Sequence, residues 1–178
     1  MRSLSQRLLV VLIVLTVENS TPACADDDAW EPFRFVIGDW VGEGKEGQGT
    51  GHFSLTPDLG GKILLRRNHA ELPAGNGRPA GVHEDLMVIY KSSDGKSAKA
   101  IYFDSEDHVI NYTVIFPRNN RQTLVFISAA DPGAPRFRLI YQKEGEDRIA
   151  IKFEIAPPGK PEEFKTYLEG KARKKAGK

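Results

Sequence analysis

The 178-residue chain has little of what marks a disulfide-stabilised or membrane-spanning protein. It contains one cysteine, Cys24, and its longest apolar run, residues 8–17, is broken only by Thr16. Such a run is too short for a stable transmembrane helix. If Cys24 is removed with the N-terminal segment described below, the remaining chain has no cysteine and takes its stability from packing. A domain of about 150 residues buries about 68–70% of its unfolded surface, enough for a substantial core without disulfides.

The sequence also lacks the common motifs of phosphate-binding and catalytic sites. The closely spaced glycines at 42–51 are followed by no Gly-Lys-Ser/Thr and by no helical pattern. There is no Gly-x-Ser-x-Gly motif. His83 does not begin a His-Glu-x-x-His motif, because Met87 stands where the second histidine is needed. These absences favour a non-catalytic protein, and no cofactor is expected.

Charge of one sign is not in excess either, since the formal net charge is +1. Residues 26–170 carry 18 basic and 23 acidic side chains, whereas residues 171–178 carry five basic and no acidic ones. A nucleic-acid-binding domain needs a basic face, so nucleic acid is not an expected partner. We interpret 171–178 as a solvated basic C-terminal tail. Contact of this tail with an anionic lipid or polymer is the alternative.

Residues 1–25 have the layout of a secretory signal peptide. Two arginines precede the apolar run, and the small residues 23–25 (Ala-Cys-Ala) form a cleavage site. Cleavage after residue 25 leaves a domain at 26–170 and predicts a secreted or periplasmic protein. Cys24 leaves a lipoprotein anchored through this residue as the alternative, although Thr21 stands where a lipobox usually has leucine.

Beyond residue 38 the chain reads as one strand and turn after another. The predicted strands are about 39–47, 49–56, 62–72, 82–91, 97–104, 108–116, 121–128, 136–143, 148–156 and 163–172. In strand 148–156, isoleucine and phenylalanine alternate with charged residues, as a sheet around one core requires. Short connections favour pairing of successive strands, and closure protects both sheet edges. We predict an all-β, single antiparallel meander barrel of about ten strands, with a short helical lid before it.

The start of this series resembles the opening of calycin barrels, which include lipocalins, fatty-acid-binding proteins and nitrobindin-like proteins. An apolar run ends in Gly38, one spacer and Trp40. Together with residues 59–62 (Leu-Gly-Gly-Lys) and 101–105 (Ile-Tyr-Phe-Asp-Ser), it also resembles a family of secreted bacterial lipocalin-like domains of unknown function. The resemblance implies a barrel with a cavity for a small apolar ligand. It implies structural roles for Gly38 and for Trp40, which would pack across the closed end.

Two neighbouring arginines are candidate ligand-binding residues. Alternation in strand 62–72 places one of Arg66 and Arg67 inside the barrel and the other outside. A buried arginine is costly unless it is paired or meets an anion. With Tyr102 or Tyr112, the inward arginine would hold a ligand carboxylate, as in fatty-acid-binding barrels. An internal salt bridge, or an arginine that reaches the rim, is the alternative.

Two histidines are weaker candidates for metal ligands. His69 ends one predicted strand and His83 begins the next, so the loop between them would let them approach each other. Glu71, Glu84 or Asp85 would add oxygen to a two-histidine, one-carboxylate site. The alternative is that both histidines are ordinary polar residues at the barrel rim, and the sequence favours that alternative.

Three functional hypotheses follow. The first is a secreted, non-catalytic barrel that binds a small apolar or amphipathic ligand. The second is a structural or protein-interaction module with a filled barrel. The third is a metal- or haem-dependent enzyme. Nitrobindin-like proteins bind haem through a histidine near the C-terminus, and no histidine lies beyond His108 in this chain, so that ligand is not carried over.

The first prediction concerns processing. We expect the exported protein to have an intact mass that matches a chain beginning at Asp26, because residues 23–25 form the cleavage site. Mass spectrometry of protein recovered outside the cytoplasm measures this directly. A mass that matches a chain beginning at Cys24 with acyl chains attached would instead identify a lipoprotein.

Overall fold

The computed structural model describes residues 30–44, 50–74, 79–93, 97–118 and 120–176. This part of the chain forms one 3-10 helix, η1 (Glu31–Phe33), and ten strands. The strands are β1 (Gly38–Gly42), β2 (Thr50–Asp58), β3 (Ile63–Leu72), β4 (Gly81–Lys91), β5 (Ala98–Asp104), β6 (Val109–Ile115), β7 (Thr123–Ser128), β8 (Arg136–Lys143), β9 (Arg148–Ala156) and β10 (Lys165–Lys174). No helix within these ranges is long and apolar enough to cross a bilayer. The predicted signal peptide, residues 1–25, lies outside them.

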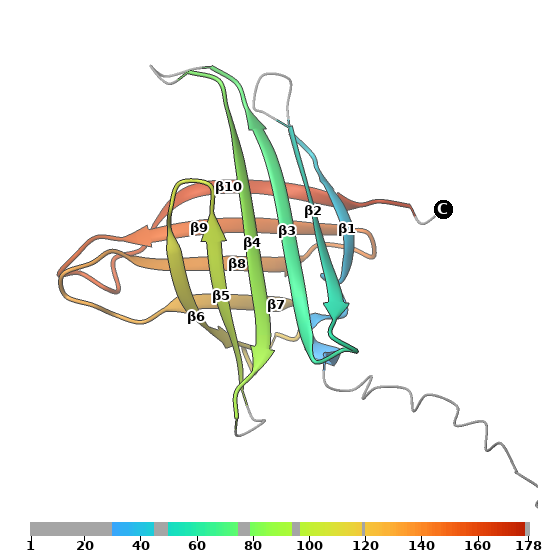
Figure 1. Ribbon diagram of the computed structural model, residues 1–178, viewed down its shortest axis with the longest axis horizontal. Coiled ribbons are helices and arrows are strands. Elements are labelled where there is room, and N and C mark those ends of the chain that lie inside the picture. Colours follow the sequence, from blue (N-terminus) through green and yellow to red (C-terminus); the bar gives the residue numbers. More distant parts are fainter. Residues whose placement is uncertain (1–29, 45–49, 75–78, 94–96, 119, 177–178) are drawn as a thin grey trace, which may run out of the picture.

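Successive strands pair antiparallel, and β1 also pairs with β10, so the sheet closes into a barrel. The predicted fold class is therefore confirmed, and the topology is consistent with a calycin-like fold. Figure 1 shows that β2, β3 and β4 run steeply across the front, while β7 to β10 cross behind them at a large angle. This crossing follows from the twist and tilt that strands need in a closed barrel.

Strand boundaries differ from the prediction mainly at the ends of the series. β1 ends at Gly42 rather than near residue 47, and β10 continues to Lys174, so the basic segment 171–178 begins inside the sheet. The expected helical lid is one turn of 3-10 helix. Pro32 fits the first turn of this helix, where its missing N–H is not needed for a hydrogen bond. Gly38 has a φ of +129°, a conformation that favours glycine, and it directs the chain into β1.

The short helix η1 closes one end of the barrel. Trp30 Nε1 donates a hydrogen bond of 2.8 Å to the carbonyl of Gly61, in the β2–β3 turn. The ring of Phe33, 1% exposed, meets Phe116 edge to face with centroids 5.3 Å apart. Because these partners lie at the ends of different strands, η1 joins the strand ends and excludes water from the core below.

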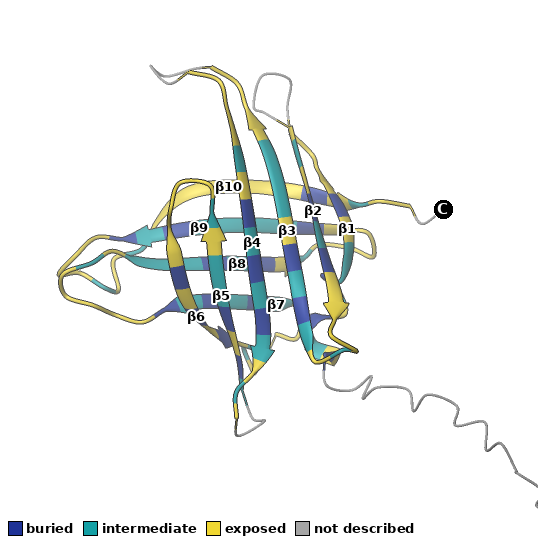
Figure 2. Ribbon diagram, viewed as in Figure 1, coloured by how far each residue is buried: buried dark blue, intermediate teal, exposed yellow. Residues whose placement is uncertain are grey.

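Trp40 lies directly inside this closed end. Its side chain is 1% exposed, its Nε1 donates to the carbonyl of Val36 at 2.8 Å, and its ring stacks on Phe53 with centroids 6.0 Å apart. Around it, the buried side chains of all ten strands form one core (Figure 2). Trp40 thus fills the barrel interior next to the closed end.

Removal of this ring tests its contribution to stability. We expect Trp40→Ala to lower the free energy of unfolding by about 3–5 kcal/mol, because a fully buried aromatic side chain leaves a large cavity. Denaturant unfolding followed by circular dichroism measures the change. Val41→Ala is the matched control, because Val41 is the next residue and is 40% exposed. A loss under about 1 kcal/mol for Trp40→Ala would show that the ring does not support the core.

Candidate functional site

The two arginines of β3 point to opposite sides of the barrel wall. Arg66 lies in the core with 7% of its surface exposed, and Arg67 is exposed on the outer face. Leu64, on the same face as Arg66, is fully buried, as the two-residue period of a strand requires. Of the two candidates, only Arg66 can therefore reach a ligand inside the barrel.

Arg66 forms an internal salt bridge with Asp85 of β4. Its Nη1 donates to Asp85 Oδ1, while Asn68 Nδ2 donates to Asp85 Oδ2 at 3.0 Å. The guanidinium also lies over the ring of Phe53, 5.2 Å from its centroid. Burial opposes the charge of Arg66, yet Tyr141 and the Asp85 carboxylate hold its pKa above the ordinary value. Because the positive charge meets a negative one, this part of the interior is neutral overall.

Two polar atoms beside this pair have no hydrogen-bond partner among the described residues. They are Arg66 Nε and the hydroxyl of Tyr141, and both are buried. The Tyr141 side chain lies near enough to interact electrostatically with the guanidinium. A hydrogen bond between the two side chains is nonetheless among the causes of both pKa shifts, so Arg66 and Tyr141 are polar partners of each other.

His83 connects the internal salt bridge to the barrel rim. Its Nε2 lies 3.3 Å from Asp85 Oδ2, and its Nδ1 lies 3.0 Å from Glu106 Oε1. The hydroxyl of Tyr102 is 3.3 Å from the same Nε2. The hydrogen bond with Asp85, assisted by that with Glu106, raises the pKa of His83 to about 9 against the cost of burial. A chain of alternating charges thus runs from Arg66 through Asp85 and His83 to Glu106.

The two candidate tyrosines belong to a chain of aromatic rings inside the barrel. The rings of Tyr102 and Tyr112 are 6.4 Å apart, and Tyr112 is 3% exposed. Contacts between ring centroids at 5.9–6.4 Å then continue through Phe126, Tyr141 and Phe53. Burial raises the pKa of both Tyr102 and Tyr112. Tyr112 is therefore part of the packed core, whereas the partly buried Tyr102 faces the polar chain.

The structure does not bring the two candidate metal ligands together. His69 lies opposite Glu84, and His83 lies opposite Ala70, the residue next to His69. Because successive residues of a strand point to opposite faces, His69 is on the outer face and His83 on the inner one. The imidazole of His69 instead stacks on that of His52, with centroids 5.3 Å apart.

The inner face of β10 is open to solvent in the half of the barrel away from η1. Every residue from Lys165 to Lys171 is exposed, which includes inward-facing ones, and Figure 2 shows this strand mostly in yellow. Gly170 lies opposite Ile151 and shares its face with Ala172, which is 1% exposed. A Cβ atom added at Gly170 would have no atom within 4 Å. This position on the inner face of β10 therefore borders open space.

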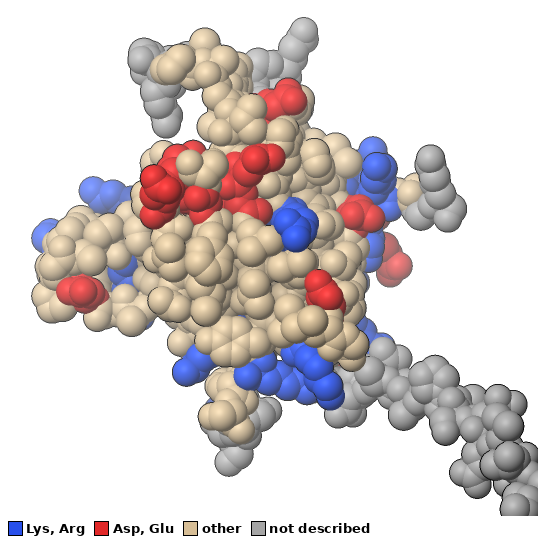
Figure 3. Space-filling view, viewed as in Figure 1, with Lys and Arg blue, Asp and Glu red and all other residues tan. Residues whose placement is uncertain are grey.

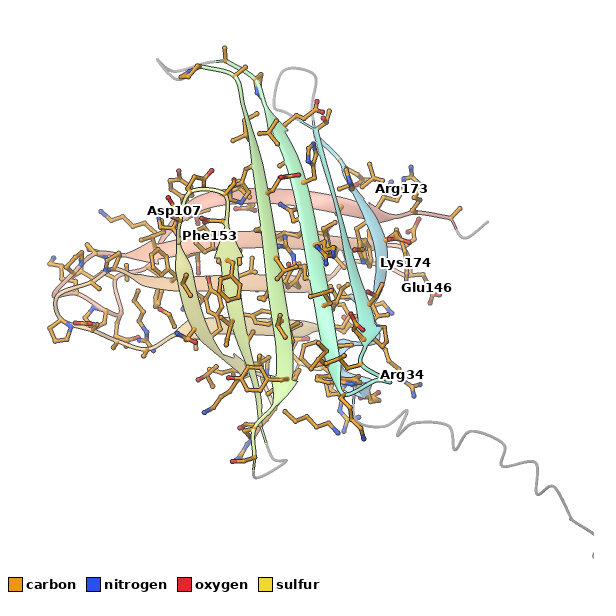
Figure 4. The ribbon with its side chains drawn as sticks, in the orientation of Figure 1. Arg34, Asp107, Glu146, Phe153, Arg173 and Lys174 are labelled. Carbon is orange, nitrogen blue, oxygen red and sulfur yellow. The ribbon has the colours of Figure 1, made fainter. Side chains whose placement is uncertain are left out.

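A separate groove of about 980 Å³ crosses the outer face of β1 to β5. Most of its lining side chains point away from the core, and they include His52, Arg67, His69, Glu71, Glu84 and Phe103. Beyond its β5 edge, Figure 3 shows acidic atoms gathered around the β5–β6 turn, where Glu106 and Asp107 are exposed (Figure 4 labels Asp107). The protein thus has a polar groove on its outer face, in addition to the exposed inner face of β10.

Sequence reasoning missed several residues of these sites. Asp85 was considered only as a weak metal ligand, although it shares its strand face with the buried Met87 and Ile89. That parity was the available signal for a buried carboxylate. The alternation in strand 136–143 places Tyr141 on the buried face but gives no sign of a polar role for its hydroxyl, and nothing local marks Gly170 as inward-facing.

No protein-family model matches the chain, and the search of curated proteins found no match.

The raised pKa of His83 leads to a prediction of how the stability of the protein depends on pH. With its folded-state pKa near 9 and an ordinary value of 6.5, its protonation stabilises the folded protein fully below about pH 6.5. This contribution is lost as the pH rises through about 9. We expect the His83 ring signals in NMR spectra to titrate near pH 9. We also expect the free energy of unfolding to lose the contribution of protonated His83 between about pH 6.5 and pH 9. In the control His83→Gln this loss is absent; titration of His83 near 6.5 would contradict the prediction.

Proposed function

We propose that this barrel binds a small apolar or amphipathic molecule in the half opposite η1, without catalysis. The observation that carries the proposal is the open inner face of β10 at Gly170, where an added Cβ atom meets nothing within 4 Å. In a closed barrel, an inward-facing position without neighbours borders interior space that side chains leave free. A ligand site needs such space, lined mainly by apolar groups.

The wall that faces this space is apolar. Phe137 of β8 and Phe153 of β9 stack with centroids 6.0 Å apart, and they are only partly buried, as is Ile151 (Phe153 is labelled in Figure 4). Leu168, inward-facing on β10, is 50% exposed. Apolar side chains that point into a barrel yet remain accessible gain free energy when an apolar ligand covers them, about 25 cal/mol per Å².

The half of the barrel nearer η1 is packed, which supports a structural role for that half. Trp40, Phe126 and Tyr141 are each no more than 2% exposed there. A module with a wholly filled barrel is therefore the second candidate function. The accessible wall of β8 to β10 favours ligand binding over it.

The internal salt bridge changes the chemistry expected of the ligand. The sequence offered a ligand carboxylate or an internal salt bridge as the partner of the inward arginine, and the charge of Arg66 is matched by Asp85. A second carboxylate would bring an unpaired negative charge into the barrel, which is costly. An uncharged polar end, such as that of an alcohol or a ketone, adds no unpaired charge and is therefore favoured.

The proposal retains the expected location outside the cytoplasm, secreted or periplasmic, with a lipid anchor at Cys24 as the alternative. The layout of residues 1–25 supports export. The ligand would then be met outside the cytoplasm.

A substitution that fills the open space tests the proposal. We expect a neutral fluorescent dye that brightens in apolar surroundings to bind the wild-type protein, and Gly170→Trp to weaken binding at least about 10-fold by occupying the site. Glu169→Trp is the matched control, because residue 169 adds the same ring on the outer face. If neither the wild-type protein nor Glu169→Trp takes up the dye, ligand binding is rejected and a structural module with a filled barrel is favoured.

The same assay distinguishes the polar ends of ligands. At pH 7.5, a long-chain alcohol should displace the dye at lower concentration than the carboxylic acid of equal length. In Asp85→Asn, which leaves Arg66 without its counter-charge, the preference should reverse toward the acid. If the acid is preferred by the wild-type protein, the assignment of an uncharged polar end is wrong, although ligand binding itself stands.

A further inference from the structure

Three metal-ligating side chains lie together on the outer face of β2 and β3. His52 of β2 lies directly opposite His69 of β3, and their rings stack 5.3 Å apart. Glu71 follows His69 by two residues on the same face, and its Oε1 lies 3.7 Å from His69 Nε2. Two donors at i and i+2 on one strand, plus one on the next strand, can surround a single ion above a sheet.

The spacing of the two β3 donors suits a small divalent ion. Zinc binds histidine nitrogen and carboxylate oxygen at about 2.0–2.2 Å, so two ligand atoms of a tetrahedral ion lie roughly 3.3 Å apart. The observed 3.7 Å between His69 Nε2 and Glu71 Oε1 needs only a small adjustment. His52 is exposed, and its ring must turn from its stacked position on His69 before a ring nitrogen reaches the same point.

A second carboxylate orients the central histidine. Glu84 Oε1 of β4 lies 3.2 Å from His69 Nδ1, on the ring nitrogen away from Glu71. A proton on Nδ1 that is donated to Glu84 leaves the lone pair of Nε2 directed at the Glu71 side. Metal-bound histidines usually have such a carboxylate behind them, which fixes the tautomer and strengthens the ligand.

The surroundings leave this position accessible to an ion. His52, His69 and Glu71 all line the outer groove. The nearest basic residue on β3 is Arg67, which lies on the side of His69 away from Glu71 in the register of the strand. Glu71 and Glu84, with side chains 68% exposed, supply two negative charges beside this position, and the basic residues that line the same groove are Arg67 and Lys175.

From this arrangement we infer that His52, His69 and Glu71 form a binding site for zinc or another borderline divalent transition-metal ion, with Glu84 positioning His69. Two imidazoles and one carboxylate suit such ions, whereas magnesium and calcium prefer oxygen ligands alone. Three protein ligands leave one position of a tetrahedral ion for water or for a donor from another molecule.

A competing cluster lies at the β5–β6 turn. Among the described residues, Asp104, Glu106 and His108 are the one group of three whose ligand atoms already lie within 4.8 Å of one another. These carboxylates already have partners. Asp104 Oδ1 accepts the backbone N–H groups of Glu106 and His108, each at 3.0 Å, and Glu106 binds His83. With one imidazole among its three donors, this cluster is the weaker ligand set for a transition metal.

The test is a titration of the full, untagged protein with Zn²⁺ by calorimetry, and with Co²⁺ by visible absorption. We expect one ion per chain, and at least about 10-fold weaker binding in His52→Ala, His69→Ala and Glu71→Gln. Glu84→Gln should also weaken binding about 10-fold, but the Co²⁺ spectrum should be unchanged because Glu84 is not itself a ligand.

His108→Ala and Glu106→Gln are the matched controls, since they remove the same residue types from the other cluster and should leave the affinity unchanged. All substituted side chains lie at least partly exposed, and a cooperative unfolding transition in each variant will show that it is folded. The inference is overturned if the protein binds no Zn²⁺, or if binding is lost in His108→Ala and kept in His52→Ala. Neither result bears on dye binding inside the barrel.

Discussion

Closure of the sheet by β1 and β10 is the constraint on which the rest of the structure depends. β1 has five residues, and its register with β10 places Trp40 opposite Lys174. Without this contact the meander would have two free edges and no defined interior. Once it forms, each residue of each strand is assigned to the inside or the outside. The closed end, the open inner face of β10 and the outer groove all follow from that assignment.

The same constraint gives neighbouring residues different chemistry. Arg66 enters the core and needs Asp85, whereas Arg67 remains in solvent. His69 faces the outer groove, and His83, on the next strand, faces the interior. Side chains that look like one cluster in the sequence are therefore divided between a neutral interior network and a surface with several carboxylates. The proposed ligand and metal sites are separate because the barrel wall lies between them.

Local patterns predicted the fold well and the sites less well. The turns and the alternation placed nine strands within two residues of their observed bounds, because each depends on neighbours in the chain. Partners such as Arg66 and Asp85, or His52 and His69, depend on how strands are aligned across a loop. The periodicity of a single strand carries no information on that alignment. The alternation did require that one of the two arginines be inside, but it could not name its partner.

Closure also has a consequence for the order of events in folding. The contact between Trp40 and Lys174 joins residues about 130 positions apart, so much chain entropy is lost before the contact forms. The pairings from β2 to β9 are all between sequence neighbours and form without it. A chain that lacks β10 therefore presents unpaired edges at β1 and β9, so partly synthesised or truncated forms are those most exposed to aggregation. The sheet has no free edge for association with another chain only after β10 has paired with both β9 and β1.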